Sequence, residues 1–133
     1  AELAEMEWCK KRDCESQESL ETEKKGILEA TRHFQQLRFQ GGILKVENKV
    51  VAFTFGEALT NDTVVIHIEK ADPDIRGAYQ TINQQFLEHQ WRQMTFVNRE
   101  EDLGIDGLRK AKKSYNPVKM IEKFTLTPVL ARA

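Results

Sequence analysis

The spacing of apolar residues predicts two helices in the first part of the chain. Over residues 1–12 the apolar positions recur at helical spacing, at Leu3 and Met6, with Cys9 as a candidate third member. A second series recurs at intervals of three, four and seven, and it comprises Leu20, Ile27, Thr31, Phe34 and Leu37. Ser16 or Ser19 is a candidate N-cap for this second helix. We expect Gly41-Gly42 to end it, because glycine adopts the left-handed conformation that closes many helices. The sequence thus predicts N-terminal helices over residues 1–38.

From residue 42 the period of the pattern changes to two, which is the period of a strand with one buried face. The strands are expected at residues 43–47, 50–57 and 63–70, with turns between them. We therefore predict an antiparallel meander over residues 42–70. Alternation in the third strand places Val64, Ile66 and Ile68 on one face, and Val65, His67 and Glu69 on the other. Lys70 then points away from His67 unless a bulge intervenes.

Helices and strands alternate over residues 73–126. Asp72-Pro73 is a favourable helix start, because aspartate caps helices well and proline suits the first helical position. This helix is expected to bury Ile75, Ala78, Tyr79, Ile82 and Phe86. A short strand over 94–98, a helix over 104–114 and a strand over 118–126 complete the pattern. A helix that joins two strands suggests a parallel crossover. The fold class is therefore α+β, with a mixed, twisted sheet of about five or six strands and helices on both faces.

Composition narrows the class of protein without naming its function. The chain has 133 residues, which suits one domain with a real core, and its formal net charge is −1. It has neither an apolar run of about 20 residues nor a secretory signal pattern. It begins at Ala1 directly in a helical pattern, which indicates a piece of a longer protein. The two cysteines, Cys9 and Cys14, form no metal site and favour a reduced, cytoplasmic protein.

Charge is unevenly distributed near the C-terminal end. Residues 104–123 contain six basic residues against two acidic ones; the bases are Arg109, Lys110, Lys112, Lys113, Lys119 and Lys123. Such a patch suits a phosphate, a nucleic acid or an anionic lipid headgroup at a membrane surface. The alternative is a solvated helix face with no ligand.

Three motifs carry the chemical content of the chain. The first comprises Gly41-Gly42-x-x-x-Val46, Val51-Ala52-Phe53 with Gly56-Glu57, and Val65-x-His67-x-Glu69-Lys70-Ala71-Asp72. The second is Gly77-Ala78-Tyr79-Gln80-x-Ile82-Asn83. The third is Asn98-Arg99-Glu100-x-Asp102-x-Gly104-x-x-Gly107-Leu108-Arg109-x-x-Lys112-x-Ser114-Tyr115-x-Pro117. Together they resemble the phosphatidylglycerol lysyltransferase C-terminal-domain-like family, from about Trp8 to Phe124.

That resemblance implies a bacterial transferase scaffold with a GNAT-like acyltransferase fold, often present as a tandem pair. The implied activity is transfer of an acyl or aminoacyl group to an amine or hydroxyl acceptor. Acyl-CoA or aminoacyl-tRNA is the implied donor. The partner is then a missing N-terminal GNAT-like domain or a second copy. The segment 74–79 departs from the usual pyrophosphate loop, because Asp74 is acidic and Tyr79 is bulky, which disfavours ordinary acetyl-CoA.

Four residues are candidates for proton transfer. His67 titrates near neutral pH and can take a proton from an attacking amine, and Glu69 shares its predicted face. The alternative for this pair is a buried hydrogen bond that supports the sheet. Glu100 is the best carboxylate candidate for a general base in its loop. Tyr115 can act as a general acid on a leaving group, a role often given to tyrosine in GNAT enzymes, or can simply pack as an aromatic residue.

Further polar residues are candidates for binding substrate or donor. They are Lys70, Tyr79, Asn83, Asn98, Arg99, Asp102, Arg109 and Lys112. Arg99 suits a carboxylate or phosphate because its guanidinium binds both oxygens at once. The competing interpretation is an internal ion network of Arg99, Glu100, Asp102 and Arg109 that fixes the loop. For the whole chain, the rival to a transferase is a non-catalytic half-domain that binds a ligand or dimerises.

Overall fold

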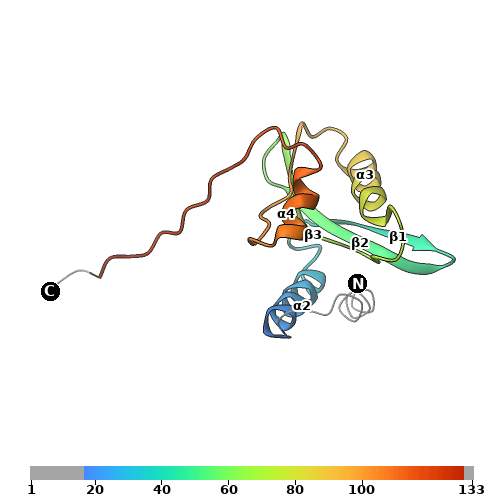
Figure 1. The fold of residues 1–133 in the computed structure, drawn as a ribbon, viewed down its shortest axis with the longest axis horizontal. Helices are drawn as coiled ribbons and strands as arrows, with labels where there is room; N and C mark the ends of the chain where they lie inside the picture. The colour runs from blue at the N-terminus through green and yellow to red at the C-terminus, as the bar shows by residue number, and fades with distance from the viewer. Residues whose placement is uncertain (1–16, 131–133) are drawn as a thin grey trace. The chain divides into compact units, whose positions relative to one another are not determined.

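The computed structural model describes residues 17–130, which fall into two compact units, one ending at Glu100 and the other beginning at Glu101. The described part of the first unit, residues 17–100, contains two helices and four strands (Figure 1). They are α2 (Gln17–Arg32), β1 (Gln40–Val46), β2 (Lys49–Ala58), β3 (Thr63–Ala71), α3 (Ala78–Gln90) and β4 (Phe96–Asn98). The second unit contains α4 (Asp106–Lys113) followed by an extended segment. The predicted helix at residues 1–12, with both cysteines and Ser16, lies outside the described residues.

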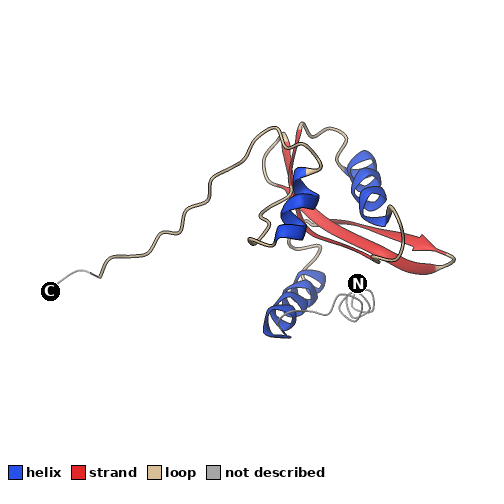
Figure 2. Ribbon diagram, in the orientation of Figure 1, coloured by secondary structure: helices blue, strands red, loops and turns tan. Residues whose placement is uncertain are grey.

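The four strands form one sheet in the order β1-β2-β3-β4 (Figure 2). β1, β2 and β3 pair antiparallel, which confirms the predicted meander, and β4 pairs parallel to the start of β3. The turn between β1 and β2 uses Glu47 and Asn48, both with positive φ, which is the geometry of a tight hairpin turn. The α3 helix joins the parallel pair β3 and β4, which confirms the predicted crossover. The sheet has four strands, fewer than the five or six expected.

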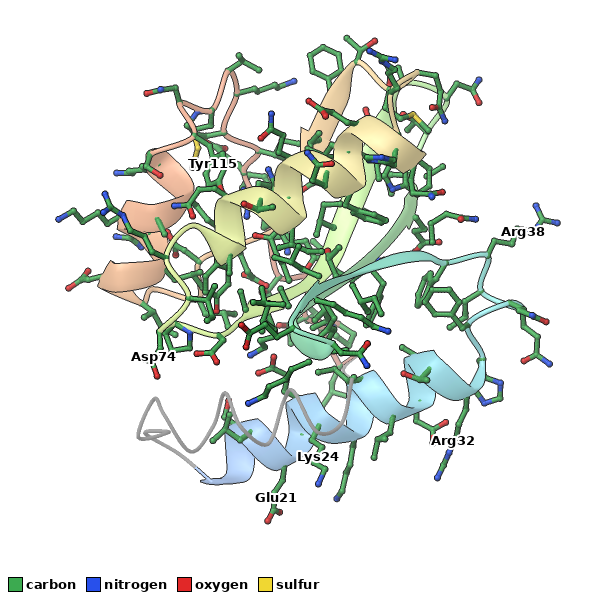
Figure 3. All side chains as sticks on the ribbon, turned by 90° about the vertical axis from the view of Figure 1, so that its right-hand side faces the viewer. Glu21, Lys24, Arg32, Arg38, Asp74 and Tyr115 are labelled. Carbon is green, nitrogen blue, oxygen red and sulfur yellow. The ribbon has the colours of Figure 1, made fainter. Side chains whose placement is uncertain are left out.

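Helices cover both faces of this sheet, as predicted (Figure 1). On one face, α3 packs Ala78, Ile82 and Phe86 against small and β-branched residues of the strands. On the other face, Ile27 of α2 is buried with Phe53 and Phe55. β2 serves both cores because its side chains alternate between the faces, so it is the most deeply buried strand. Figure 3 shows Glu21 and Arg32 on the outer side of α2.

A bulge in β3 breaks the alternation that the sequence predicted. The register passes from Ile66 opposite Gly56 directly to Ile68 opposite Phe55, so His67 has no partner in β2. Val64 and Ile66 lie in the core under α3, whereas Ile68 packs with Ile27 and Phe55 under α2. The prediction that Val64, Ile66 and Ile68 share one face was therefore wrong. The extra residue shifts all later side chains of the strand to the opposite face.

The predicted end of the second helix was also wrong. Helix α2 ends at Arg32, turns follow to residue 38, and Gly41 and Gly42 lie inside β1. A Cβ on Gly41 would lie 3.0 Å from Cζ of Phe34, so this glycine makes room for an aromatic ring on the strand. The candidate cap Ser19 lies within α2, because the helix already begins at Gln17.

The helix predicted to start at Asp72-Pro73 begins later, at Ala78. Asp72 instead accepts the N–H of Asp74 and closes a turn, because a short carboxylate competes well for nearby backbone N–H groups. Gly77, with φ of 80°, then precedes the helix. Of the residues expected on the buried side of α3, Ala78, Ile82 and Phe86 are buried, while Ile75 and Tyr79 are partly buried.

In the second unit, α4 matches the predicted helix within two residues, and Asn116 with φ of 52° follows its end. Residues 118–126 do not form the predicted strand. A strand needs a partner for its backbone groups, and this unit contains no strand among its described residues. Across residues 17–130, no helix is both long and apolar enough to cross a bilayer.

Candidate functional site

His67 lies between two carboxylates in the first unit. Its Nδ1 is 2.9 Å from Oε1 of Glu100, and its Nε2 is 2.9 Å from Oε1 of Glu57. All three side chains are between 29% and 39% exposed, so solvent and a ligand can reach them. An imidazole whose two ring nitrogens both face carboxylates can hold a proton at either nitrogen. We call these three residues the histidine site.

The backbone around the histidine site is irregular at two positions. His67 is the extra residue of the β3 bulge, and bulges often direct a side chain into a functional site. Glu100 has φ of 56°, in the left-handed region that is unfavourable for a residue with a Cβ. The side chain of Asn98 accepts the N–H of Glu100 at 2.8 Å and so supports that conformation. Asn98 thus positions Glu100 through the backbone.

The surroundings of His67 change its affinity for protons. Partial burial by itself lowers the pKa of His67, but the hydrogen bonds and charges of Glu57 and Glu100 outweigh burial and raise the pKa above its ordinary value of 6.5. The ring of Phe39 lies 5.3 Å from the His67 ring, close enough for a favourable contact with an imidazolium. His67 therefore keeps its proton to a higher pH than an ordinary histidine does.

A groove of about 390 Å³ opens beside His67 and Glu57, between α2 and the sheet. Its walls are mainly apolar, and they include Ile27 of α2, Phe39, Phe55 and Ile68. Phe39 and Phe55 stack with ring centres 5.5 Å apart, and Phe34 packs edge-on against both. The histidine site thus lies beside an apolar, partly aromatic surface, which is a common composition of ligand sites.

The second predicted proton acceptor, Glu69, lies apart from His67. Glu69 pairs with Arg99 at 2.7 Å, and the two side chains are only 9% and 21% exposed. Because the bulge shifts the alternation, Ile68 lies under α2, and Glu69 pairs across the sheet with Thr54 on the α3 side. The predicted common face of His67 and Glu69 was wrong. The pair Glu69–Arg99 joins β3 to the segment after β4 and fixes the loop that carries Glu100.

The residues of the predicted 98–115 network form separate pairs. Asp102 in the second unit accepts two hydrogen bonds from Arg109, at 2.7 and 3.3 Å, and one from the N–H of Gly104. The Arg109 guanidinium and the Gly104 N–H lower the pKa of Asp102 to about 2. Lys112 donates to the backbone carbonyl of Glu101 at 2.6 Å. These contacts stabilise the turn before α4 and present basic side chains around it.

The remaining predicted residues occupy other places. Lys70 pairs with Glu23 of α2 at 2.7 Å. Tyr79 packs partly buried on the core of α3, and Asn83 is buried in the same helix. No hydrogen-bond partner for Oδ1 of Asn83 occurs within the described part of the chain. Tyr115 is 40% exposed in the turn after α4. The structure does not bring Lys70, Tyr79 or Asn83 into hydrogen-bond contact with His67.

Two residues of the site were missed by the sequence analysis. Glu57 appeared only as part of a motif, although its place one residue before the end of β2 puts it opposite Val65, near His67. Gly26 lines the groove from the interior of α2. A glycine within a helix is unfavourable by about 1 kcal/mol relative to alanine. This cost was the feature of the sequence that could have pointed to a special role for Gly26.

The chain matches one protein family over nearly its whole length. The model of the family described as "Phosphatidylglycerol lysyltransferase, C-terminal" matches residues 1–127. No curated protein sequence matches the chain. A conserved protein of unknown function from Bacteroides thetaiotaomicron is 47% identical, with a TM-score of 0.83 over 90% of this chain. The match covers only 40% of that protein, so this chain spans less than half of its relative's length.

Two acetyltransferase structures show the same fold at low sequence identity. A possible acetyltransferase from Clostridium difficile has a TM-score of 0.61 at 13% identity, over 97% of this chain and 90% of its own. An aminoglycoside acetyltransferase from an uncultured soil metagenomic sample, in complex with sisomicin, has a TM-score of 0.53 at 17% identity, over 75% of this chain and 74% of its own. The fold is therefore the GNAT-like acyltransferase fold expected from the sequence. With a family model that matches nearly its whole length, the chain belongs to the phosphatidylglycerol lysyltransferase C-terminal family.

Proposed function

We propose that this domain transfers an acyl or aminoacyl group to an amine acceptor, with the histidine site as the proton acceptor. The observation that carries the proposal is the position of His67 between Glu57 and Glu100, beside a groove that a ligand can enter. Membership of the family and the acyltransferase fold support the reaction class. The same fold can host many reactions, so the residues of the histidine site, and not the fold, support this reaction.

The proposed reaction makes one bond and breaks another. The acceptor nitrogen attacks the acyl carbonyl carbon, and the bond from that carbon to the donor's sulfur or oxygen breaks. The nitrogen loses a proton to neutral His67 or to a neighbouring carboxylate, and the leaving group gains one from solvent or an acid. Glu57 and Glu100 stabilise the imidazolium that forms. A positioned proton acceptor of this kind typically contributes about 10²–10⁴-fold in rate.

For the second unit we propose binding of the donor's phosphate or carboxylate groups. Arg109 and Lys112 lie on α4, whose last turn also carries Lys110 and Lys113. Arg109 is oriented by Asp102, and a guanidinium held in this way retains further N–H donors for an anion. Acyl-CoA and aminoacyl-tRNA both supply such groups.

A donor-binding screen by thermal shift tests the proposal. Acetyl-CoA, longer acyl-CoAs and aminoacyl-tRNA are added in turn to the wild-type chain and to Arg109→Ala. We expect a rise in melting temperature with at least one donor, and its loss in Arg109→Ala. Glu88→Ala, on the exposed side of α3, is the matched control and retains the rise. A folded wild-type protein that shows no shift with any donor contradicts the transferase proposal.

The alternative function, a non-catalytic half-domain that dimerises, has an observation of its own. Residues 118–130 carry seven large apolar side chains, each at least 69% exposed; they are Val118, Met120, Ile121, Phe124, Leu126, Val129 and Leu130. Such a run of exposed apolar residues is typical of a segment that docks on another surface. Light scattering on the chain distinguishes a dimer from a monomer. The two functions are compatible if the dimer completes an active site.

A further inference from the structure

We propose that the groove between α2 and the sheet binds the apolar body of the acceptor, and that the acceptor is a primary amine with an aromatic or aliphatic group. This inference rests on the proposed function for its meaning in catalysis, because it names the substrate class of the same site. The binding itself requires only the groove and the charges at its end.

The walls of the groove select an apolar body. Ile27 is 4% exposed and Phe55 is 7% exposed, so both form a rigid floor. Phe39 stacks on Phe55 and also contacts the His67 ring, so the aromatic surface continues up to the histidine site. Burial of apolar ligand surface contributes roughly 25 cal/mol for each Å² removed from water. A polar ligand body would gain nothing from these walls.

The polar end of the groove selects a cation. Glu57 and His67 lie on its lining, and Glu100 contacts His67 from the opposite ring nitrogen. Glu57 and Glu100 together carry two negative charges, and His67 carries at most one positive charge. The net charge of the histidine site is therefore negative whether or not His67 is protonated. Glu23, at another part of the lining, is already paired with Lys70. An ammonium group is therefore attracted to the histidine site, and a carboxylate or phosphate is repelled from it.

Gly26 is a second, independent indication that the space over the floor of the groove is left open. It lies within α2, on the same side as Glu23, Ile27 and Ala30, and it lines the groove. A Cβ at Gly26 would meet no atom of residues 17–130 within 4 Å, so packing within this part of the chain does not require a glycine there. Alanine at position 26 would stabilise the helix by about 1 kcal/mol relative to glycine. The glycine therefore keeps space free over the apolar floor, and a larger side chain at this position would fill that space.

Position 26 provides a matched pair of variants. Gly26→Leu places four carbons over the floor of the groove, whereas Gly26→Ala improves the helix and adds only one. The probe is 2-phenylethylamine, and the neutral and anionic controls are 2-phenylethanol and 3-phenylpropionate. Binding is measured by NMR titration of backbone amides, with the amide of Gly26 as the local reporter in the wild-type chain. Circular dichroism confirms that each variant is folded.

We expect the amine to bind at least tenfold more tightly than the alcohol, with no saturable binding of the carboxylate. Gly26→Leu should weaken amine binding at least tenfold, while Gly26→Ala should change it less than twofold. Glu57→Gln should reduce the preference for the amine over the alcohol. Equal binding of the amine and the alcohol, or unchanged binding by folded Gly26→Leu, overturns the inference.

The same variants separate this inference from the proposed function. If the amine binds as expected but no donor yields an amide product, the acceptor groove stands and the transferase proposal fails. If transfer to amines occurs with a KM that Gly26→Leu leaves unchanged, the transferase proposal stands and the groove does not hold the acceptor.

Discussion

At the scale of single residues, the environment of His67 depends on one extra position in a strand. His67 and Glu100 were each predicted as candidates for proton transfer, but the contact between them was not predicted. The pairing of His67 with Glu57 could not be predicted from the alternation of apolar and polar residues, because that alternation does not show where a strand has a bulge. The bulge also places His67 and Glu69 on opposite faces of β3, although strict alternation predicted that they share one face.

The first prediction concerns the protonation of His67. Its pKa in the folded protein lies above 6.5, and Glu57→Gln and Glu100→Gln should each lower it. Since the folded pKa is raised, the stabilisation from these contacts is complete below about pH 6.5 and is lost as the pH rises through the folded pKa. NMR titration of the His67 ring measures the pKa in the wild-type chain and in each variant. A His67 pKa below that of the denatured chain contradicts the account.

The second prediction compares two glycines. A Cβ at Gly56 would lie 2.2 Å from the carbonyl oxygen of Val65, opposite the bulge, so Gly56→Ala forces the two strands apart. We expect Gly56→Ala to lower the free energy of unfolding by about 3 kcal/mol. Gly26→Ala should instead raise it by up to about 1 kcal/mol, because the added Cβ meets no atom of the described residues and alanine favours a helix. Urea unfolding of both variants checks the pair, and a Gly56→Ala protein as stable as the wild type would show that the strands do not approach so closely.

At the scale of elements, hydrophobic periodicity predicted the meander and the parallel crossover well. β1, β2, β3 and α3 are 7 to 13 residues long, which is enough for the period to be recognised from the apolar positions. The ends of elements were harder to predict. Gly41 and Asp72 each have two common uses, and the choice between a helix boundary and another role depends on partners distant in sequence, such as Phe34 against Gly41. The predicted strand at 118–126 has the right period, but residues 101–130 of its unit provide no partner strand.

The third prediction concerns the ion pair that holds the loop after β4. Glu69 and Arg99 are mostly buried, so removing one charge leaves the other without compensation in a poorly solvated place. Arg99→Met should lower the free energy of unfolding by about 3 kcal/mol. A double-mutant cycle with Glu69→Gln should give a coupling energy of about 1–3 kcal/mol. The exposed pair Glu29–Arg32 is the control, with a coupling below about 0.5 kcal/mol. Equal coupling in the two pairs would contradict a structural role for Arg99.

At the scale of the whole molecule, the chain contains two units with different chemical character. The first unit holds the histidine site and the groove, and the second holds the basic helix α4 and the exposed apolar segment. The relative from Bacteroides thetaiotaomicron is more than twice as long as this chain, so the family includes proteins with further sequence beside this domain. An apolar segment without a partner strand is consistent with docking on such sequence or on a second copy.

The fourth prediction therefore concerns self-association. Replacing Ile121, Phe124 and Leu126 by serine removes three exposed apolar side chains and no packed ones. We expect the wild-type chain to associate with increasing concentration in analytical ultracentrifugation, and the triple variant to associate at least tenfold more weakly. Thermal unfolding of the variant should match the wild type within about 0.5 kcal/mol, as for other surface changes. A wild-type chain that stays monomeric at high concentration would exclude this use of the segment.

An acyl-transfer assay on His67→Gln tests whether the histidine site is catalytic. Wild type, His67→Gln and the exposed control His33→Gln are each given a donor that binds and 2-phenylethylamine, and amide formation is followed by mass spectrometry. We expect a wild-type rate that rises with pH through a pKa above 6.5, a loss of about 10²–10⁴-fold in His67→Gln, and no change in His33→Gln. Equal rates for folded His67→Gln and wild type would contradict the assignment of the histidine site to catalysis.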